Sequence, residues 1–244
     1  ANMSGATGQN AVDFLNICTV SLQRVDTELS LRLLEYGCKV VQPDNPNYEI
    51  FQAESVAYRI LAGGEVSEAE ENQAIAYFRR EMTDPKKMKD MTEQLTVLLS
   101  VMMQHERWTK VKPLADEVSQ IIDENHVDTP ESNNSLGLVY RQLQEYDKAA
   151  KYQKRAVDAM QPDTTQYYLT LFNYICIIQE TGRCLENKEI LEETIPKIKE
   201  KFGDDIGTYA LYLHAYSKVL TEMRCPEEAM KVMDQLIPLM LKHM

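Results

Sequence analysis

Residues 130–163 carry small and aromatic side chains at spacings that favour two closely packed helices joined by a short turn. Gly137 would lie on the first helix, and Ala149 and Ala156 on the second. Small side chains at these places let two antiparallel helices approach closely, because interaxial distance depends on the residues at the contact. Larger apolar side chains would then fill the remaining space between the helices: Leu136, Tyr140 and Tyr146.

Both expected helices have start signals. Thr129 can cap the first helix, with Pro130 as its first residue and Glu131 in the first turn, where an acidic side chain is favoured. The second helix is expected to begin near Asp147, after a turn over residues 143–146. The segment is therefore predicted to be a helix-turn-helix unit.

This unit resembles the tetratricopeptide repeat (TPR). The TPR consensus has L-G-x-x-Y on the first helix, an alanine nine residues after the tyrosine and a second alanine seven residues later, as residues 136–156 do here. The family usually has glycine at the place of Gln144, so the turn departs from the pattern. The resemblance implies an all-α fold, a right-handed superhelical solenoid of antiparallel helix pairs.

Weaker copies of the unit flank the clear one. Trp108 precedes Tyr146 by 38 residues, Cys184 follows it by 38, and Ser67-Glu68-Ala69-Glu70 has the form of a capping box. We expect one TPR-like domain over 1–244, with the first residues fitting an expression scar. A plain helical bundle is the alternative for the first and fifth units. The six expected helix pairs span 9–46, 48–83, 85–126, 130–162, 164–203 and 205–243.

Composition narrows the function classes. The net charge is −12, which disfavours binding to a phosphate backbone, so no nucleic-acid partner is expected. The longest apolar run, residues 95–103, is about half of the roughly 18 residues that a membrane span needs. The five cysteines show no C-x-x-C spacing, which favours a reducing, cytoplasmic location; an extracytoplasmic sensor region is the alternative.

Patterns that carry catalysis or bind a cofactor are not found in the sequence. It contains no G-x-S-x-G, no phosphate loop and no dinucleotide fingerprint. None of the four histidines is paired with another histidine or a cysteine at a metal-ligand spacing: His105, His126, His214 and His243. We therefore expect no enzyme, no metal and no cofactor.

The family resemblance also implies a binding surface, because the first helices of successive units line the concave face of a TPR solenoid. Aligning the units places a mixture of polar and apolar side chains there, which suits an amphipathic helix or a partly apolar peptide. Chaperone-binding members of the family hold a C-terminal carboxylate with lysines and asparagines at these positions. Such a carboxylate clamp is not expected here, because the cations Arg141 and Lys218 are two units apart. Some of these residues could instead pack between units. The predicted partner-binding residues are Thr96, Ser100, Met103, Asn134, Leu138, Arg141, Phe172, Cys176, Gln179, His214 and Lys218.

Two functions are compatible with these features. The first is a protein-interaction module, a scaffold or adaptor that holds a peptide or helix of a partner protein. The second is a ligand- or peptide-sensing region of a larger bacterial regulatory protein, such as a histidine kinase or a transcription regulator. The sequence does not fix the oligomeric state.

Overall fold

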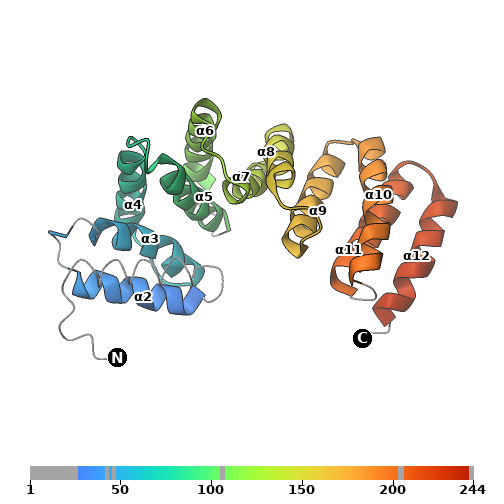
Figure 1. Cartoon of the computed structure of the whole chain (residues 1–244), viewed down its shortest axis with the longest axis horizontal. Coiled ribbons are helices and arrows are strands. Elements are labelled where there is room, and N and C mark those ends of the chain that lie inside the picture. Colours follow the sequence, from blue (N-terminus) through green and yellow to red (C-terminus); the bar gives the residue numbers. More distant parts are fainter. Residues whose placement is uncertain (1–26, 42–43, 46–47, 105–107, 203–205, 242–244) are drawn as a thin grey trace. The chain divides into compact units, whose positions relative to one another are not determined.

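A computed structural model describes residues 27–41, 44–45, 48–104, 108–202 and 206–241 of the chain. All regular secondary structure in these ranges is helical, which confirms the all-α prediction (Figure 1). The first helix of the expected 9–46 pair and the expected expression scar lie outside the described residues. The helices are α2 (Thr27–Val40), α3 (Tyr48–Leu61), α4 (Glu68–Glu81), α5 (Met88–Gln104), α6 (Trp108–Asn125), α7 (Pro130–Gln142), α8 (Tyr146–Ala159), α9 (Thr165–Glu180), α10 (Cys184–Phe202), α11 (Ile206–Glu222) and α12 (Pro226–Leu241).

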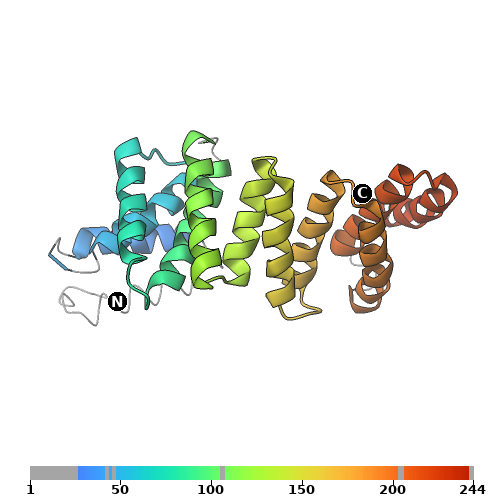
Figure 2. The same cartoon turned by 90° about the horizontal axis from the view of Figure 1, so that it is seen from above.

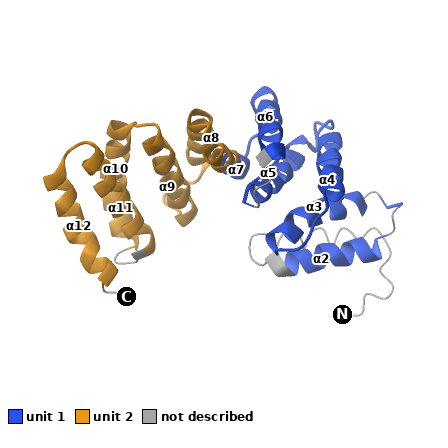
Figure 3. Ribbon diagram, turned by 180° about the vertical axis from the view of Figure 1, so that it is seen from behind, with its two compact units in different colours: residues 1–135 blue, residues 136–244 orange. Residues whose placement is uncertain are grey.

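The chain divides into two compact units, residues 1–135 and 136–244, with the division inside α7 (Figure 3). We call them unit 1 and unit 2 and describe each by itself. Within the described residues, the helix boundaries follow the expected pairs from residue 48 onward. A single continuous solenoid over the whole chain stays a prediction.

In unit 1, α3 is the central element and contacts α2, α4 and α5. Its Phe51 is fully buried and packs on Gly37 of α2, where an added Cβ would lie 2.9 Å from the ring. The predicted capping box at the start of α4 is confirmed. The Ser67 hydroxyl accepts a bond from the Glu70 amide (3.3 Å), and the Glu70 carboxylate accepts one from the Ser67 amide (2.8 Å).

In unit 2, consecutive helices from α8 to α12 pack side by side, and Figure 2 shows them in chain order. The α7–α8 pair has the predicted close contact: a Cβ on Gly137 would lie 3.1 Å from the backbone nitrogen of Gln153. Tyr140 stacks on Tyr152 with ring centroids 5.7 Å apart. Three residues predicted for this contact have no exposed surface: Leu136, Ala149 and Ala156.

The turn between the two helices of each pair has the same backbone form three times in unit 2. Gln144, Gly182 and Arg224 all have positive φ, at 61°, 73° and 61°. The next residue in each turn donates its amide to a carbonyl five residues earlier, at 2.9, 3.2 and 2.9 Å, which is the Schellman motif. The spacing of these turns fixes the repeat register of unit 2 at 38 and then 42 residues.

The second helices of neighbouring pairs also make polar contacts with each other, between residues about 40 positions apart in the sequence. Lys110 of α6 donates to Asn72 of α4, 38 residues earlier, over 3.2 Å. Lys188 of α10 pairs with Glu228 of α12, 40 residues later, over 3.5 Å. Equivalent helices of neighbouring pairs therefore lie next to each other within each unit.

The left-handed turn position gives a testable consequence. A non-glycine residue in this conformation is strained by roughly 1–2 kcal/mol, so Gln144→Gly should raise the free energy of unfolding by about 1 kcal/mol. Gly182→Ala, at the equivalent turn, should lower it by a similar amount. Urea denaturation of both variants checks this prediction; two shifts of the same sign would show that the turn conformation does not decide stability.

Candidate functional site

The first helices of the pairs in unit 2 form a connected face, which we call the inner face: α7 from residue 136, α9 and α11. Arg141 of α7 pairs with Glu180 of α9 over 4.0 Å. Gln179 of α9 donates to Glu222 of α11 over 3.0 Å. These contacts place α9 between the other two helices, as the alignment of units predicts.

Cys176 lies near the middle of the inner face, and its thiol is half-buried. Burial raises the pKa of this thiol, whereas the positive charges of Arg141 and Lys218 lower it and Glu180 raises it. Both cations are therefore close enough to act on one side chain. Two repeats separate them in the sequence, but they lie on α7 and α11, and α9 contacts both of these helices.

The apolar part of the inner face centres on Phe172, whose ring lies 5.6 Å from that of Tyr212 in a tilted arrangement. Leu169 and Leu211 add exposed apolar surface, each with 41% of its surface accessible. They stand three residues before Phe172 and His214, so helical periodicity places them on the same face. These two leucines were not among the residues predicted from the sequence, although this spacing could have revealed them.

The structure distributes the other predicted residues over a range of exposure. His214 and Lys218 are exposed on α11. Six residues of α7 and α9 are half-buried, with part of each accessible to a partner: Asn134, Leu138, Arg141, Phe172, Cys176 and Gln179.

The predicted positions on α5 have a different environment. Thr96 and Met103 are buried in the packing of unit 1, and Ser100 is half-buried. The Thr96 hydroxyl donates to the Glu93 carbonyl (2.7 Å), and the Ser100 hydroxyl donates to the Thr96 carbonyl (3.1 Å). These hydroxyls are satisfied by their own helix, because serine and threonine commonly bond to the preceding turn. Thr96 and Met103 are packing residues and offer no surface to a partner.

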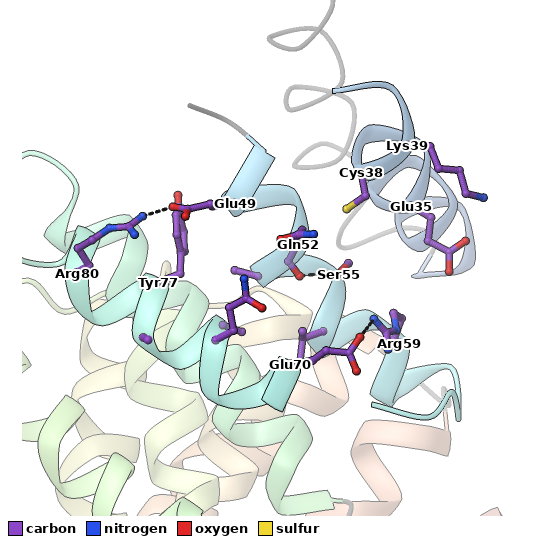
Figure 4. A pocket seen from close by; sticks show the side chains of 15 residues that line it. Glu35, Cys38, Lys39, Glu49, Gln52, Ser55, Arg59, Glu70, Tyr77 and Arg80 are labelled. Carbon is purple, nitrogen blue, oxygen red and sulfur yellow. Dashed lines mark hydrogen bonds and ion pairs between the residues drawn. The ribbon is translucent and has the colours of Figure 1, made fainter. Parts of the chain in front are cut away.

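Unit 1 contains a groove of about 680 Å³ between α2 and α4, with α3 as its floor (Figure 4). Two ion pairs join α3 to α4 along it: Arg59 with Glu70 at 2.7 Å, and Arg80 with Glu49. Figure 4 shows the Cys38 side chain of α2 across from them. This groove was not predicted from the sequence, because its width depends on the distance between α2 and α4.

The charged groups that line the groove are balanced in sign. Hydrogen bonds from Arg59 and Ser67 lower the pKa of Glu70 to about 2, so this carboxylate is ionised and engaged. Burial raises the pKa of the Cys38 thiol, which keeps it protonated and weakly nucleophilic. Three acidic and three basic side chains line the groove: Glu35, Glu49, Glu70, Lys39, Arg59 and Arg80.

Neither a metal site nor a membrane span is found in the described ranges. No group of three or more His, Cys, Asp or Glu side chains there could hold a metal ion. None of the described helices combines the length and the apolar character needed to cross a bilayer.

Comparison with solved structures gives a resemblance in architecture. The chain is similar to crystal structures of nearly identical TPR-like repeats attributed to a putative kinesin light chain of Podosopora anserina. In one of them the TM-score is 0.45 at 13% identity, covering 95% of this chain and 96% of that one. For a variant of those repeats with a single substitution, the TM-score is 0.46 at 12% identity, with 95% of each chain covered. No protein-family model and no curated protein matches the sequence.

Proposed function

We propose that this chain, an all-helical protein of TPR-like helix pairs, is a protein-interaction module that holds a peptide or helix of a partner on the inner face of unit 2. The observation that carries the proposal is the joint exposure of apolar and cationic side chains on α9 and α11. Leu169 and Leu211 are each 41% accessible, and Lys218 is exposed on the same face. Apolar surface with a few placed polar groups is what a peptide-binding groove provides.

The inner face suggests how a partner would be oriented. Apolar side chains of the partner would contact Leu169, Phe172 and Leu211, whereas polar or acidic groups would lie near Arg141 and Lys218. Arg141 already pairs with Glu180, so a partner would share or displace that contact. The exposed charges would mainly set orientation and association rate, and the apolar contacts would supply most of the affinity.

The alternative function, a sensing region of a larger regulator, would use the same face. It differs in what the bound peptide controls, not in how it is held. In neither function does the chain itself catalyse a reaction, and the engaged carboxylates and protonated thiol of the unit 1 groove fit a structural role.

Two substitutions test the inner face once a partner has been captured by affinity purification and identified by mass. Phe172→Ala removes an aromatic anchor, and Arg141→Glu reverses a charge; each should weaken binding by about tenfold or more. The matched control is Lys154→Glu on α8, whose exposed side chain pairs with Asp158 of the same helix at 3.1 Å. Calorimetric titration of the four proteins measures the effect. If both inner-face variants bind the partner with full affinity and the Lys154 variant does not, the binding site lies elsewhere.

A further inference from the structure

The second helix of each pair in unit 2 can be aligned with the others through its first residue. Tyr146, Cys184 and Pro226 are the first residues of α8, α10 and α12, and each follows a turn of the same left-handed form by two residues. Positions on the three helices therefore correspond at offsets of 38 and 42 residues.

One face of α8 and α10 is covered by the first helix of the following pair. On α8 this face includes the buried Gln153, which donates to the Thr170 carbonyl of α9 over 3.2 Å. On α10 the equivalent residue is Leu191, which is fully buried, and α10 packs on α11. At the margin of this interface Tyr216 of α11 donates its hydroxyl to Glu192 over 2.7 Å.

The equivalent face of α12 is apolar but exposed to solvent. Its residues Met230, Met233, Ile237 and Met240 match positions 188, 191, 195 and 198 of α10. Met230, Ile237, Met240 and the adjoining Leu241 are 66%, 47%, 53% and 66% accessible. The other side of the helix packs on α11 through buried Ala229, Val232 and Leu236.

This open face, which we call the α12 stripe, runs along the helix at spacings of three and four residues, as a helix-packing surface does. Exposed apolar side chains that gather on one face in this way mark an interaction surface, whereas single scattered ones do not. Because the same positions on α8 and α10 are packing surfaces, the stripe has the geometry to receive one more helix.

We propose that the α12 stripe docks an amphipathic helix of a partner protein, which packs on α12 as α11 packs on α10. The internal interface specifies the chemistry of this helix. The docked helix carries apolar residues every three to four positions. At the margin of its contact with α12 it carries a hydroxyl or cationic donor directed at Asp234. Asp234 corresponds to Glu192, the residue that accepts the Tyr216 hydroxyl, and it is exposed on α12.

A second copy of the chain fits the stripe less well than such a helix. Asp234 stands at the middle of α12, which spans Pro226–Leu241. In an antiparallel pair of two α12 helices, Asp234 would therefore meet its own copy at the centre. Like charges directly opposed are destabilising, whereas a donor on a different helix satisfies the carboxylate.

A synthetic peptide with the sequence of α11, residues 206–222, serves as the probe, because α11 is the helix that covers the equivalent face of α10. With a fluorescent label, its polarisation should rise on titration with the whole protein. Ile237→Asp should weaken this binding by about tenfold or more, because it places a charge in the apolar stripe. The matched control, Gln235→Asp on the polar side of α12, should bind as the unchanged protein does. Equal melting temperatures of the two variants would show that neither has unfolded.

The donor contact has its own test. A Tyr216→Phe peptide should bind the unchanged protein a few-fold more weakly, and Asp234→Asn should reduce that difference between the two peptides. No binding of the probe, or equal weakening by Ile237→Asp and Gln235→Asp, would overturn the proposal. Self-association of the protein that Ile237→Asp abolishes would also overturn it, because the occupant would then be a second copy. Inner-face variants such as Phe172→Ala leave this assay unchanged, so its outcome is independent of the proposed function.

Discussion

Replacing Gly137 with leucine is expected to lower the free energy of unfolding by about 3 kcal/mol, at the upper end of the usual range for overpacking a core. A Cβ at this position would lie 2.4 Å from Oε1 of Gln153 and 3.1 Å from its backbone nitrogen. Gln153 has no exposed surface and donates to the Thr170 carbonyl, so its side chain has little freedom to move away. Relief therefore requires α7 and α8 to separate, which loosens the Tyr140–Tyr152 stack. Urea denaturation gives the measurement.

Gly207 is the matched control for this substitution. It also lies in a helix, α11, but an added Cβ there would meet no atom within 4 Å. Gly207→Leu should therefore leave stability unchanged or raise it slightly, because leucine is the better helix former. If both leucine variants unfold at the same urea concentration, the α7–α8 contact is not as close as described, and the repeat register of this pair is wrong.

Stability is also expected to depend on pH through Glu54. This side chain is 6% exposed on α3, and burial raises its pKa to about 7. Because the folded-state pKa lies above the ordinary value of 4.5, the folded chain holds this proton more tightly than the unfolded chain does. The resulting stability is fully present below about pH 4.5 and is lost as the pH rises to about 7; a shift of this size corresponds to about 3 kcal/mol.

The Glu54→Gln variant isolates this effect, since glutamine resembles the protonated acid and cannot ionise. The variant should be about as stable as the unchanged protein near pH 5 and more stable at pH 8, by up to about 3 kcal/mol. Urea denaturation at several pH values compares the two proteins. A constant difference across the range would mean that Glu54 titrates normally and that the carboxylate reaches solvent.

Local sequence chemistry and the repeat were enough to predict where the helix pairs from residue 48 onward begin and end in the described ranges. The capping box at Ser67 and the small residues around Gly137 specify contacts between residues close in the sequence, and the structure contains both. The turn at Gln144 shows the limit of the same reasoning. The family pattern has glycine there, and the chain keeps the left-handed conformation without it, because the turn's hydrogen bonds hold the backbone.

Exposure was harder to predict than helical structure, because it depends on how neighbouring helices pack. Alignment of the repeats placed Thr96 and Met103 on the predicted binding face, but both are buried in the packing of unit 1. The alignment separated Arg141 and Lys218 by two repeats. Both charges nevertheless act on the thiol of Cys176, because α9 lies between their helices. Such relations come from helix positions in space, which sequence spacing alone does not specify.

Binding of a partner on the inner face of unit 2 is tested most directly by site-specific photo-cross-linking. A benzophenone side chain is placed at the exposed position 214 on α11, and in a second protein at the exposed position 154 on α8. We expect the captured partner to cross-link from position 214 and not from position 154. Cross-linking from position 154 alone would contradict this expectation, because the partner would then lie on the second helices of the pairs.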